Sequence, residues 1–128
     1  MSQMTKKIYY HDTDCGGVVY YANYLKYLEE ARTEYLHERG IDLKAYGDRG
    51  ILFVVKNVII DYTAPARYAD NLSILTNITR IKNVSLEFSQ EIMRANQLLV
   101  SAQTTLVCID TSFKPRSIPE ELQKTFAA

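Results

Sequence analysis

The chain has 128 residues, 47% of them apolar, which is enough for one domain with a hydrophobic core. Its 15 basic and 15 acidic residues cancel, so no overall field gathers nucleic acid or anionic lipid onto the surface. No apolar run approaches the ~18 residues of a membrane-spanning helix, and no signal-peptide segment opens the chain. We therefore expect one cytoplasmic domain over residues 1–128, with no membrane span and no nucleic-acid partner.

The cysteine content supports the same compartment. Cys15 and Cys108 are too few for the disulfide framework of a small secreted protein, so a reducing environment is the simpler expectation. His11, Asp12, Asp14 and Cys15 are residue types that bind metals, but they lack a recognised ligand spacing. We expect no metal.

The N-terminal part is predicted to contain a short strand, an acidic turn and a long helix. Ile8–Tyr10 is apolar and aromatic, which favours a strand. From residue 22 to residue 39, apolar side chains recur every three or four positions with charged side chains between them, which predicts an amphipathic helix. Gly40 is placed to end that helix.

Four strands are predicted after an irregular stretch at residues 45–50. They are rich in β-branched residues and mostly alternate in polarity, and they run over Ile51–Tyr62, Asp70–Lys82, Val84–Ala95 and Leu98–Asp110. Asn83 and residues 95–97 are the predicted hairpin turns. A short C-terminal helix is predicted over Ser117–Leu122, with Pro119 near its first turn.

This element order predicts an α+β fold with a strand, one long helix and then an antiparallel four-strand meander. A five-stranded sheet offers one face that the helix can cover, and its twist lets it wrap around that helix. Two edge strands stay open in such a sheet. We expect at least a dimer, because an edge can pair with the edge of a second copy.

The most informative segment is Tyr10–Tyr24, where two carboxylates and two glycines lie between the predicted strand and the helix. A flexible acidic turn at the start of a helix can bring a carboxylate and unpaired backbone N–H donors to one atom. The segment therefore predicts an active site. The alternative is that Asp12 and Asp14 only form a turn and a helix cap, a frequent role of aspartate beside glycine.

Residues 10–32 closely resemble the 4-hydroxybenzoyl-CoA thioesterase family of hot-dog-fold acyl-CoA thioesterases, and most of all its Tol-Pal-associated, YbgC-type branch. The residues that carry the resemblance are Asp12–Asp14, Gly17–Tyr20, Asn23–Tyr24, Glu30–Arg32, Tyr62–Ala66 and Lys114–Pro119. The resemblance implies a hot-dog domain, in which an antiparallel five-stranded sheet wraps around the long central helix. It also implies active sites at a dimer interface.

The resemblance further implies roles for particular residues. Asp14 matches the catalytic carboxylate of the family, and the backbone N–H of Tyr21 matches the group that polarises the thioester carbonyl. Lys82 and Arg116 match basic residues that bind the phosphates of coenzyme A. The remaining substrate-binding candidates are Gly17, Val19 and Ser85. No cofactor is expected, since coenzyme A is part of the substrate.

Two positions differ from the YbgC-type branch. That branch usually carries histidine where this chain has Tyr21, whereas the 4-hydroxybenzoyl-CoA members carry tyrosine, so the branch does not identify the acyl group. The segment Lys82–Ser85 has one positive charge where some relatives have two or three. An acyl carrier protein therefore stays a second candidate for the acyl donor.

We expect an acyl-CoA thioesterase that converts an acyl-CoA and water into the free acid and coenzyme A. Asp14 either attacks the carbonyl carbon, forming a mixed anhydride that water opens, or activates the water as a base. Two other functions stay open. One is a hot-dog dehydratase, which needs a catalytic histidine where this chain has Tyr21. The other is a non-catalytic module that binds acyl-CoA or acyl carrier protein. Either enzyme or module is expected to be a homodimer or homotetramer.

Overall fold

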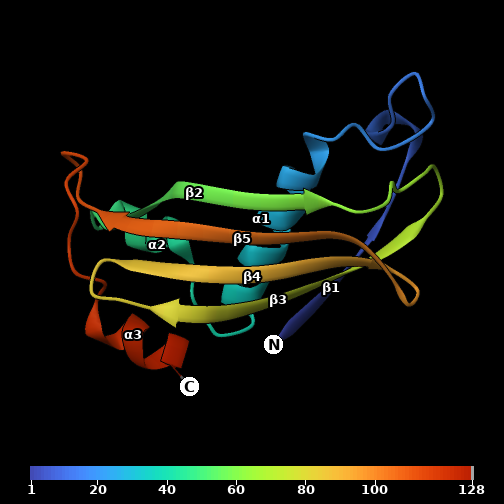
Figure 1. Cartoon of the computed structure of the whole chain (residues 1–128). Coiled ribbons are helices and arrows are strands. Elements are labelled where there is room, and N and C mark those ends of the chain that lie inside the picture. Colours follow the sequence, from blue (N-terminus) through green and yellow to red (C-terminus); the bar gives the residue numbers. More distant parts are fainter. Residues whose placement is uncertain (128) are drawn as a thin grey trace.

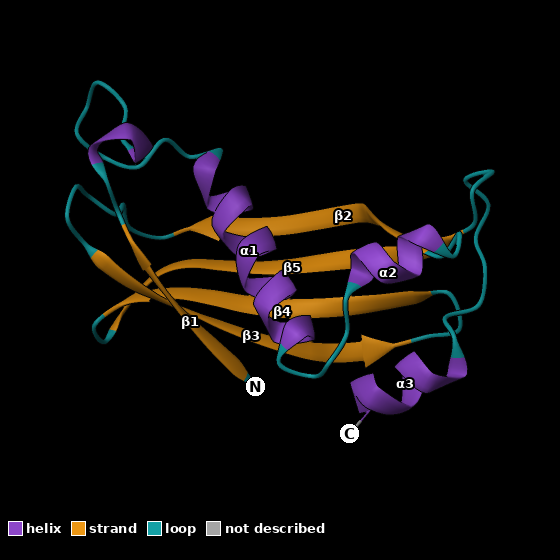
Figure 2. Ribbon diagram, turned by 180° about the vertical axis from the view of Figure 1, so that it is seen from behind, coloured by secondary structure: helices purple, strands orange, loops and turns teal. Residues whose placement is uncertain are grey.

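The computed structural model describes residues 1–127. Its elements in chain order are β1 (Ser2–Lys7), the single-turn 3-10 helix η1 (Tyr10–Asp12), α1 (Asn23–His37), α2 (Leu43–Asp48), β2 (Leu52–Tyr62), β3 (Asn71–Ile81), β4 (Ser85–Arg94), β5 (Gln97–Ile109) and α3 (Glu120–Ala127). The five strands form one antiparallel sheet, and α1 lies across one face of it (Figures 1 and 2). The predicted α+β architecture is confirmed.

The first strand lies earlier than predicted. The prediction of a strand at Ile8–Tyr10 is wrong, because β1 covers Ser2–Lys7 and the chain then turns through η1. The backbone of β1 pairs with β3, Ser2 opposite Thr76 and Lys7 opposite Asn71. An edge strand leaves one side in water, so its polar sequence carries little of the apolar signal that marks buried strands.

The predicted four-strand meander is also wrong. The strand order is β1-β3-β4-β5-β2, so only β3, β4 and β5 follow one another. Strand β2 pairs with β5 instead, Leu52 opposite Ile109 and Tyr62 opposite Val100. Residues 63–70 then carry the chain past the ends of β5 and β4 to the start of β3 (Figure 1). The two edges of the sheet are therefore β1 and β2.

The helix predicted over residues 22–39 is confirmed as α1. Gly40 follows it with a φ of +75°, and the N–H of Ile41 donates to the carbonyl of Leu36 at 2.9 Å, which closes the helix end as glycine favours. The stretch at residues 45–50, predicted to be irregular, belongs largely to α2. Asp42 caps α2, since its side chain accepts a hydrogen bond from the N–H of Lys44 at 3.0 Å.

The C-terminal helix exists but begins three residues later than predicted, at Glu120. The N–H of Ile118 donates to the carbonyl of Asn83 at 2.8 Å, so the residues before the helix run along the β3–β4 turn. The carbonyl of Pro119 then accepts the N–H groups of Leu122 and Gln123, both at 3.0 Å. No helix within residues 1–127 has the length and apolar character needed to cross a membrane.

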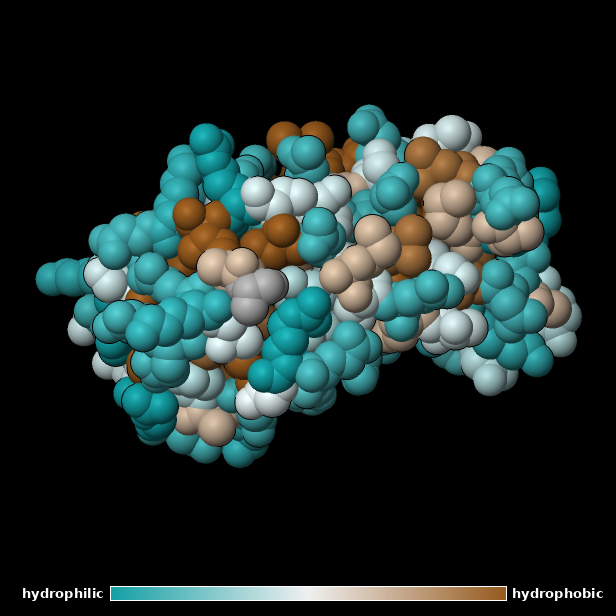
Figure 3. All heavy atoms as spheres, turned by 90° about the horizontal axis from the view of Figure 1, so that it is seen from below, coloured by the Kyte–Doolittle hydropathy of each residue, from teal (hydrophilic) through white to brown (hydrophobic). Residues whose placement is uncertain are grey.

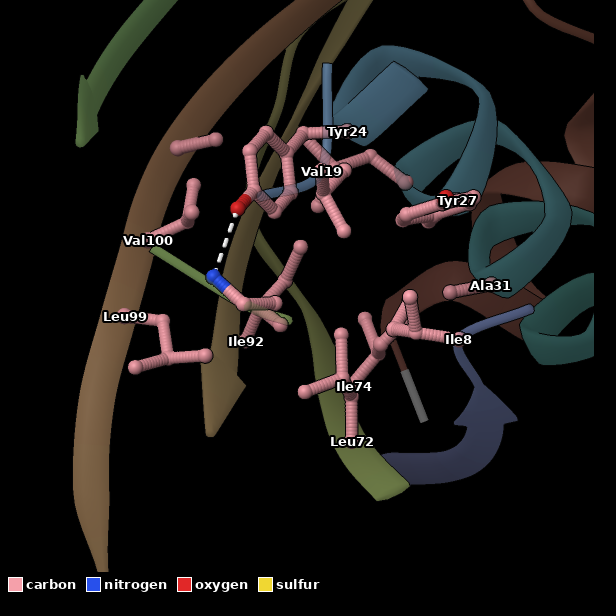
Figure 4. Packing of buried hydrophobic residues seen from close by; sticks show 13 residues of the cluster. Ile8, Val19, Tyr24, Tyr27, Ala31, Leu72, Ile74, Ile92, Leu99 and Val100 are labelled. Atoms are coloured by element: carbon pink, nitrogen blue, oxygen red, sulfur yellow. Dashed lines mark hydrogen bonds between the residues drawn. The ribbon is translucent and has the colours of Figure 1, made fainter. Parts of the chain in front are cut away.

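Two buried apolar clusters fill the space between α1 and the sheet. The first lies under the N-terminal half of α1 and includes Ile8, Tyr24, Tyr27, Leu28, Ile74, Ile92 and Val100 (Figure 4). The second lies under the C-terminal half and includes Tyr35, Leu36, Leu86, Phe88, Leu106, Ile118 and Phe126. Burial of these side chains is the main force that holds the helix to the sheet.

A polar layer runs between the two clusters. Gln90 is 1% exposed and donates from Nε2 to the carbonyl of Leu28 at 2.9 Å and to Oγ1 of Thr76 at 3.1 Å. Its Oε1 accepts a hydrogen bond from Arg32 at 3.1 Å, and Arg32 also reaches Oγ1 of Thr104 at 3.5 Å. This network fixes the distance between α1 and β4 through side-chain hydrogen bonds, which are strong in a buried environment of low dielectric constant.

Replacing Gln90 should therefore destabilise the fold more than replacing an exposed glutamine. Gln90→Ala removes the buried side chain that bonds both Arg32 and Thr76 and leaves the Arg32 guanidinium with only the 3.5 Å contact to Thr104. We therefore expect the free energy of unfolding to fall by about 2–4 kcal/mol. Gln103→Ala, on the exposed side of β5, should change it by less than about 0.5 kcal/mol. Urea unfolding of both variants measures the difference, and equal values would contradict a stabilising role for the polar layer.

Candidate active site

The turn that carries Asp14 is a small closed hairpin. The N–H of Asp14 donates to the carbonyl of Val18 at 2.9 Å, and the N–H of Gly17 donates to the carbonyl of Asp14 at 3.1 Å. Gly17 has a φ of +80°, a conformation that side chains disfavour. The exposed carboxylate of Asp14 accepts a hydrogen bond from the N–H of Gly16 at 2.7 Å. A Cβ at Gly16 would lie 3.2 Å from that same oxygen, so glycine leaves the carboxylate room.

The start of α1 offers two free backbone donors. Within residues 1–127, the N–H groups of Tyr21 and Ala22 donate no hydrogen bond, whereas the N–H of Asn23 donates to the carbonyl of Tyr20 at 2.9 Å. Unpaired N–H groups at a helix start carry the positive end of the helix dipole. They are therefore suited to bind a carbonyl oxygen on which negative charge develops.

Asp14 and Tyr21 line the same hollow, which has a volume of about 310 Å³. Its other walls are largely apolar and aromatic and consist of Val18, Val19, Tyr24, Tyr62, Thr63, Ala64 and Pro65. The ring of Tyr62 lies 6.2 Å from that of Tyr21 and 5.6 Å from that of Tyr24, between centroids. A hollow with one carboxylate and a helix start among apolar walls suits a reactive carbonyl attached to an apolar group.

Tyr24 supports one wall of this hollow through a hydrogen bond to the segment that follows β2. Its hydroxyl oxygen accepts a hydrogen bond from the backbone N–H of Ala66 at 3.0 Å, drawn as a dashed line in Figure 4. The carbonyl of Ala66 in turn accepts the N–H of Val19 at 2.9 Å. The segment that follows β2 is therefore tied both to α1 and to the turn that carries Asp14.

Asp12 lies away from the hollow. It is 5% exposed, and its carboxylate accepts the N–H of Tyr9 at 2.8 Å. Burial alone would raise the pKa of Asp12, but the hydrogen bond from Tyr9, the nearby hydroxyl of Tyr27 and the charge of Lys6 keep that pKa below its ordinary value. Asp12 therefore stays ionised as an anchor of the loop, while Asp14 faces the hollow.

Lys82 and Ser85 lie together at the opposite end of the sheet. They line a second hollow of about 210 Å³. Lys56 from β2 and Arg80 from β3 also line it, and we call it the basic hollow. Ser85 and its neighbour Glu87 alternate with buried residues of β4, so this hollow lies on the face of the sheet turned away from α1. Lys56 and Arg80 were not predicted as site residues. Arg80 lies two positions before Lys82, and the alternation of side chains along a strand could have indicated it, whereas Lys56 comes from β2 and no local pattern links it to Lys82.

The other predicted site residues do not all lie in one hollow. Val19 lines the hollow beside Asp14, whereas Gly17 shapes the turn and is not among the lining residues. Arg116 lines neither hollow, but its N–H donates to the carbonyl of Cys108 at 3.0 Å, which places it at the same end of the sheet as Lys82. No group of three or more potential metal ligands occurs within residues 1–127.

The two hollows are separated by the length of the sheet. Strand β4 runs from Ser85, beside the basic hollow, to Arg94, at the end where the Asp14 turn lies (Figure 1). Nine steps along a strand correspond to about 30 Å. Within one chain, Asp14 and Lys82 are therefore far apart.

Comparisons with known proteins agree on one family. A family model described as the thioesterase-like superfamily matches residues 9–126. The acyl-CoA thioester hydrolase YbgC of Escherichia coli is 42% identical over 122 residues, covering 94% of this chain and 91% of that protein. The 1,4-dihydroxy-2-naphthoyl-CoA hydrolase of Synechococcus elongatus is 31% identical over 124 residues, covering 94% of this chain and 91% of that protein.

A solved structure gives the same answer for the fold. Slr0204 from Synechocystis, a 1,4-dihydroxy-2-naphthoyl-CoA thioesterase, matches with a TM-score of 0.91 and 29% sequence identity. The match covers 98% of this chain and 94% of that one. The hot-dog fold implied by the sequence resemblance is confirmed.

Removing the Tyr24 hydroxyl should loosen the wall of the hollow. Tyr24→Phe leaves the buried N–H of Ala66 without an acceptor, so we expect the free energy of unfolding to fall by about 1–3 kcal/mol. Tyr10→Phe is the matched control, because Tyr10 is 79% exposed and should tolerate the change within about 0.5 kcal/mol. Thermal or urea unfolding measures both, and a Tyr24→Phe variant as stable as Tyr10→Phe would contradict the supporting role.

Proposed function

Since the chain belongs to the thioesterase-like superfamily and is an acyl-CoA thioester hydrolase, we propose that Asp14 and the first turn of α1 carry out this hydrolysis. The observation that carries the proposal is that Asp14 and Tyr21 line one hollow, with the N–H of Tyr21 unpaired within residues 1–127. A thioester carbonyl in this hollow meets a carboxylate at its carbon and an N–H donor at its oxygen.

The chemistry needs one carboxylate and one source of oxyanion stabilisation. In one route, a carboxylate oxygen of Asp14 bonds to the carbonyl carbon and the C–S bond breaks, and water then opens the mixed anhydride to regenerate Asp14. In the other, Asp14 takes a proton from water and the resulting hydroxide attacks the same carbon. In both routes the leaving thiolate takes up a proton that came from water and departs as the free thiol. The N–H of Tyr21 stabilises the negative oxygen.

The hollow favours hydrolysis over the dehydratase alternative. A hot-dog dehydratase needs a histidine facing the acyl chain, and neither His11 nor His37 lines the hollow. The proposed routes use no metal or cofactor. We place the reaction in the cytoplasm, where the exposed thiol of Cys15, next to Asp14, stays reduced. One relative is named for a 1,4-dihydroxy-2-naphthoyl group, whereas the name of YbgC specifies no acyl group. For the hollow of this chain we propose an apolar acyl group.

We assign the donor half of the substrate to the basic hollow. Lys56, Arg80 and Lys82 bring three cations to it, with Ser85 as a hydrogen-bonding group and Arg116 on the adjacent segment. Such a cluster suits the phosphates of coenzyme A. The single charge that the sequence shows between Lys82 and Ser85 is therefore supplemented by Arg80, two residues earlier, and by Lys56 of β2. An acyl carrier protein, which lacks the adenine nucleotide, stays the second candidate donor.

A complete site needs two copies of the chain, because the two hollows lie at opposite ends of one sheet. Strand β2 is the edge suited to pairing. It has eleven residues, and two of its apolar residues, Val55 and Ile59, are 52% and 57% exposed to solvent. Strand β1 has six residues, including Lys6 and Lys7, and lysine discourages pairing at an edge. Figure 3, seen from below the view of Figure 1 and so from the side away from β2, shows separate hydrophobic patches on a largely hydrophilic surface.

Pairing β2 with β2 of a second copy brings the two halves of the site together. In an antiparallel pair, the start of one strand lies beside the end of the other. The Leu52 end of the partner, with its basic hollow, then approaches Tyr62 of this chain, which lines the Asp14 hollow. Such a symmetric dimer has two equivalent sites.

Replacing Asp14 tests the catalytic assignment. Asp14→Asn keeps the size of the side chain but removes its charge, so we expect the release of coenzyme A, followed with a thiol reagent, to fall at least ~100-fold. Asp48→Asn, at the exposed end of α2, is the matched control and should keep its turnover. Turnover of Asp14→Asn near the wild-type value, with the fold intact, would refute the role of Asp14.

Mixing two chains that are impaired in different parts of the site tests the two-copy site. The double variant Arg80→Ala with Lys82→Ala should raise KM for acyl-CoA more than it lowers kcat, because these residues contact the nucleotide and not the reacting carbon. Mixed with Asp14→Asn chains under conditions of subunit exchange, it should form dimers in which one site is intact. About a quarter of all sites are then wild type, and activity at low substrate concentration should recover to about that level. No recovery, with mixed dimers present, would contradict the two-copy site.

A further inference from the structure

The backbone carbonyl of Asp12 joins the catalytic loop to the start of α1. It accepts a hydrogen bond from the N–H of Tyr20 at 3.1 Å and another from Nδ2 of Asn23 at 3.0 Å. Asp12 is itself held by its carboxylate, which accepts the N–H of Tyr9. One fixed acceptor therefore holds the residue before Tyr21 and the residue two places after it.

The peptide of Tyr21 is confined by this arrangement. Tyr20 and Asn23 are tied on the loop side, and on the sheet side the hydroxyl of Tyr62 donates to the carbonyl of Tyr21 at 3.4 Å. The free N–H of Tyr21 lies between these contacts and has no acceptor of its own within residues 1–127. The direction of this N–H is therefore set by the hydrogen bonds that its neighbouring residues make, because the N–H itself has no acceptor.

The side chain of Asn23 does not serve the helix as a cap. The N-terminus of α1 has no side-chain cap hydrogen bond, and the Asn23 amide instead donates away from the helix, to Asp12. Asn23 is also absent from the lining of the hollow. Within residues 1–127, the side-chain hydrogen bond of Asn23 therefore serves neither helix capping nor substrate contact.

We propose that Asn23 is a positioning residue for thioester hydrolysis, whose amide holds the first turn of α1 so that the N–H of Tyr21 points at the substrate carbonyl. The inference rests on the proposed function of Asp14 and Tyr21. An oxyanion donor acts only when it is aimed at the place where charge develops. A misplacement of about 1 Å can cost ~100-fold in rate.

The sharpest test is Asn23→Asp. This variant keeps the size of the side chain but turns the donor facing the Asp12 carbonyl into an acceptor, so the two oxygens repel. A negative charge in the first turn of a helix favours helix stability, so stability should not fall. We expect kcat to fall about tenfold or more, with KM for acyl-CoA within about twofold. Asn23→Gln, which keeps an amide donor on a longer side chain, should recover part of the rate.

The matched control is Asn77→Asp, the same chemical change on the exposed surface of β3, which should leave kcat unchanged. If the kcat of Asn23→Asp equals that of Asn77→Asp, the inference is overturned, while Asp14 keeps its role. A merely structural role would show instead as a lower unfolding temperature with kcat and KM both impaired, and that result would also overturn it. Asn23→Ser, with a shorter donor, replaces Asn23→Asp in the same comparison if the latter fails to fold. A wild-type chain that releases no thiol from any acyl-CoA would be a failure of the proposed function.

Discussion

A helix cannot satisfy the first N–H groups of its own backbone, and the site of this protein is arranged around that constraint. At the start of α1 the N–H groups of Tyr21 and Ala22 have no acceptor within residues 1–127, and the hollow that contains Asp14 opens beside them. The loop before the helix is fixed by Asp12, and the segment after β2 is fixed by Tyr24. These contacts hold the chain segments on either side of the free donors.

The sheet supports this arrangement through its strand order. Because β2 lies at the edge beside β5, its last residue, Tyr62, reaches the start of α1 and forms a wall of the hollow. The same order leaves the long, partly apolar edge of β2 without a partner strand in one chain. The polar layer around Gln90 sets the distance between helix and sheet under the middle of α1, so the two ends of the helix are held by apolar packing on either side of it.

Local patterns in the sequence predicted the parts that depend on neighbours in the chain. The helix period between residues 22 and 39, Gly40 at its end and the turn with Gly16 and Gly17 all depend on contacts within a few residues. The prediction failed where long-range pairing decides. Strand β1 is polar and is held by β3, and β2 pairs with a strand some forty residues later. The short helix α2, which the apolar pattern did not predict, depends on the Asp42 cap.

The amino-acid sequence by itself indicated the chemistry that we propose for this protein, because the spacing of Asp14 and the glycines before a strong helix is a local property. It also determined the family, through residues distributed over nearly the whole chain. Only the tertiary structure decided which carboxylate faces the hollow, since Asp12 and Asp14 differ in burial and not in kind. Only the tertiary structure brought Lys56 of β2 to Arg80 and Lys82, because strand pairing unites side chains that are distant in sequence.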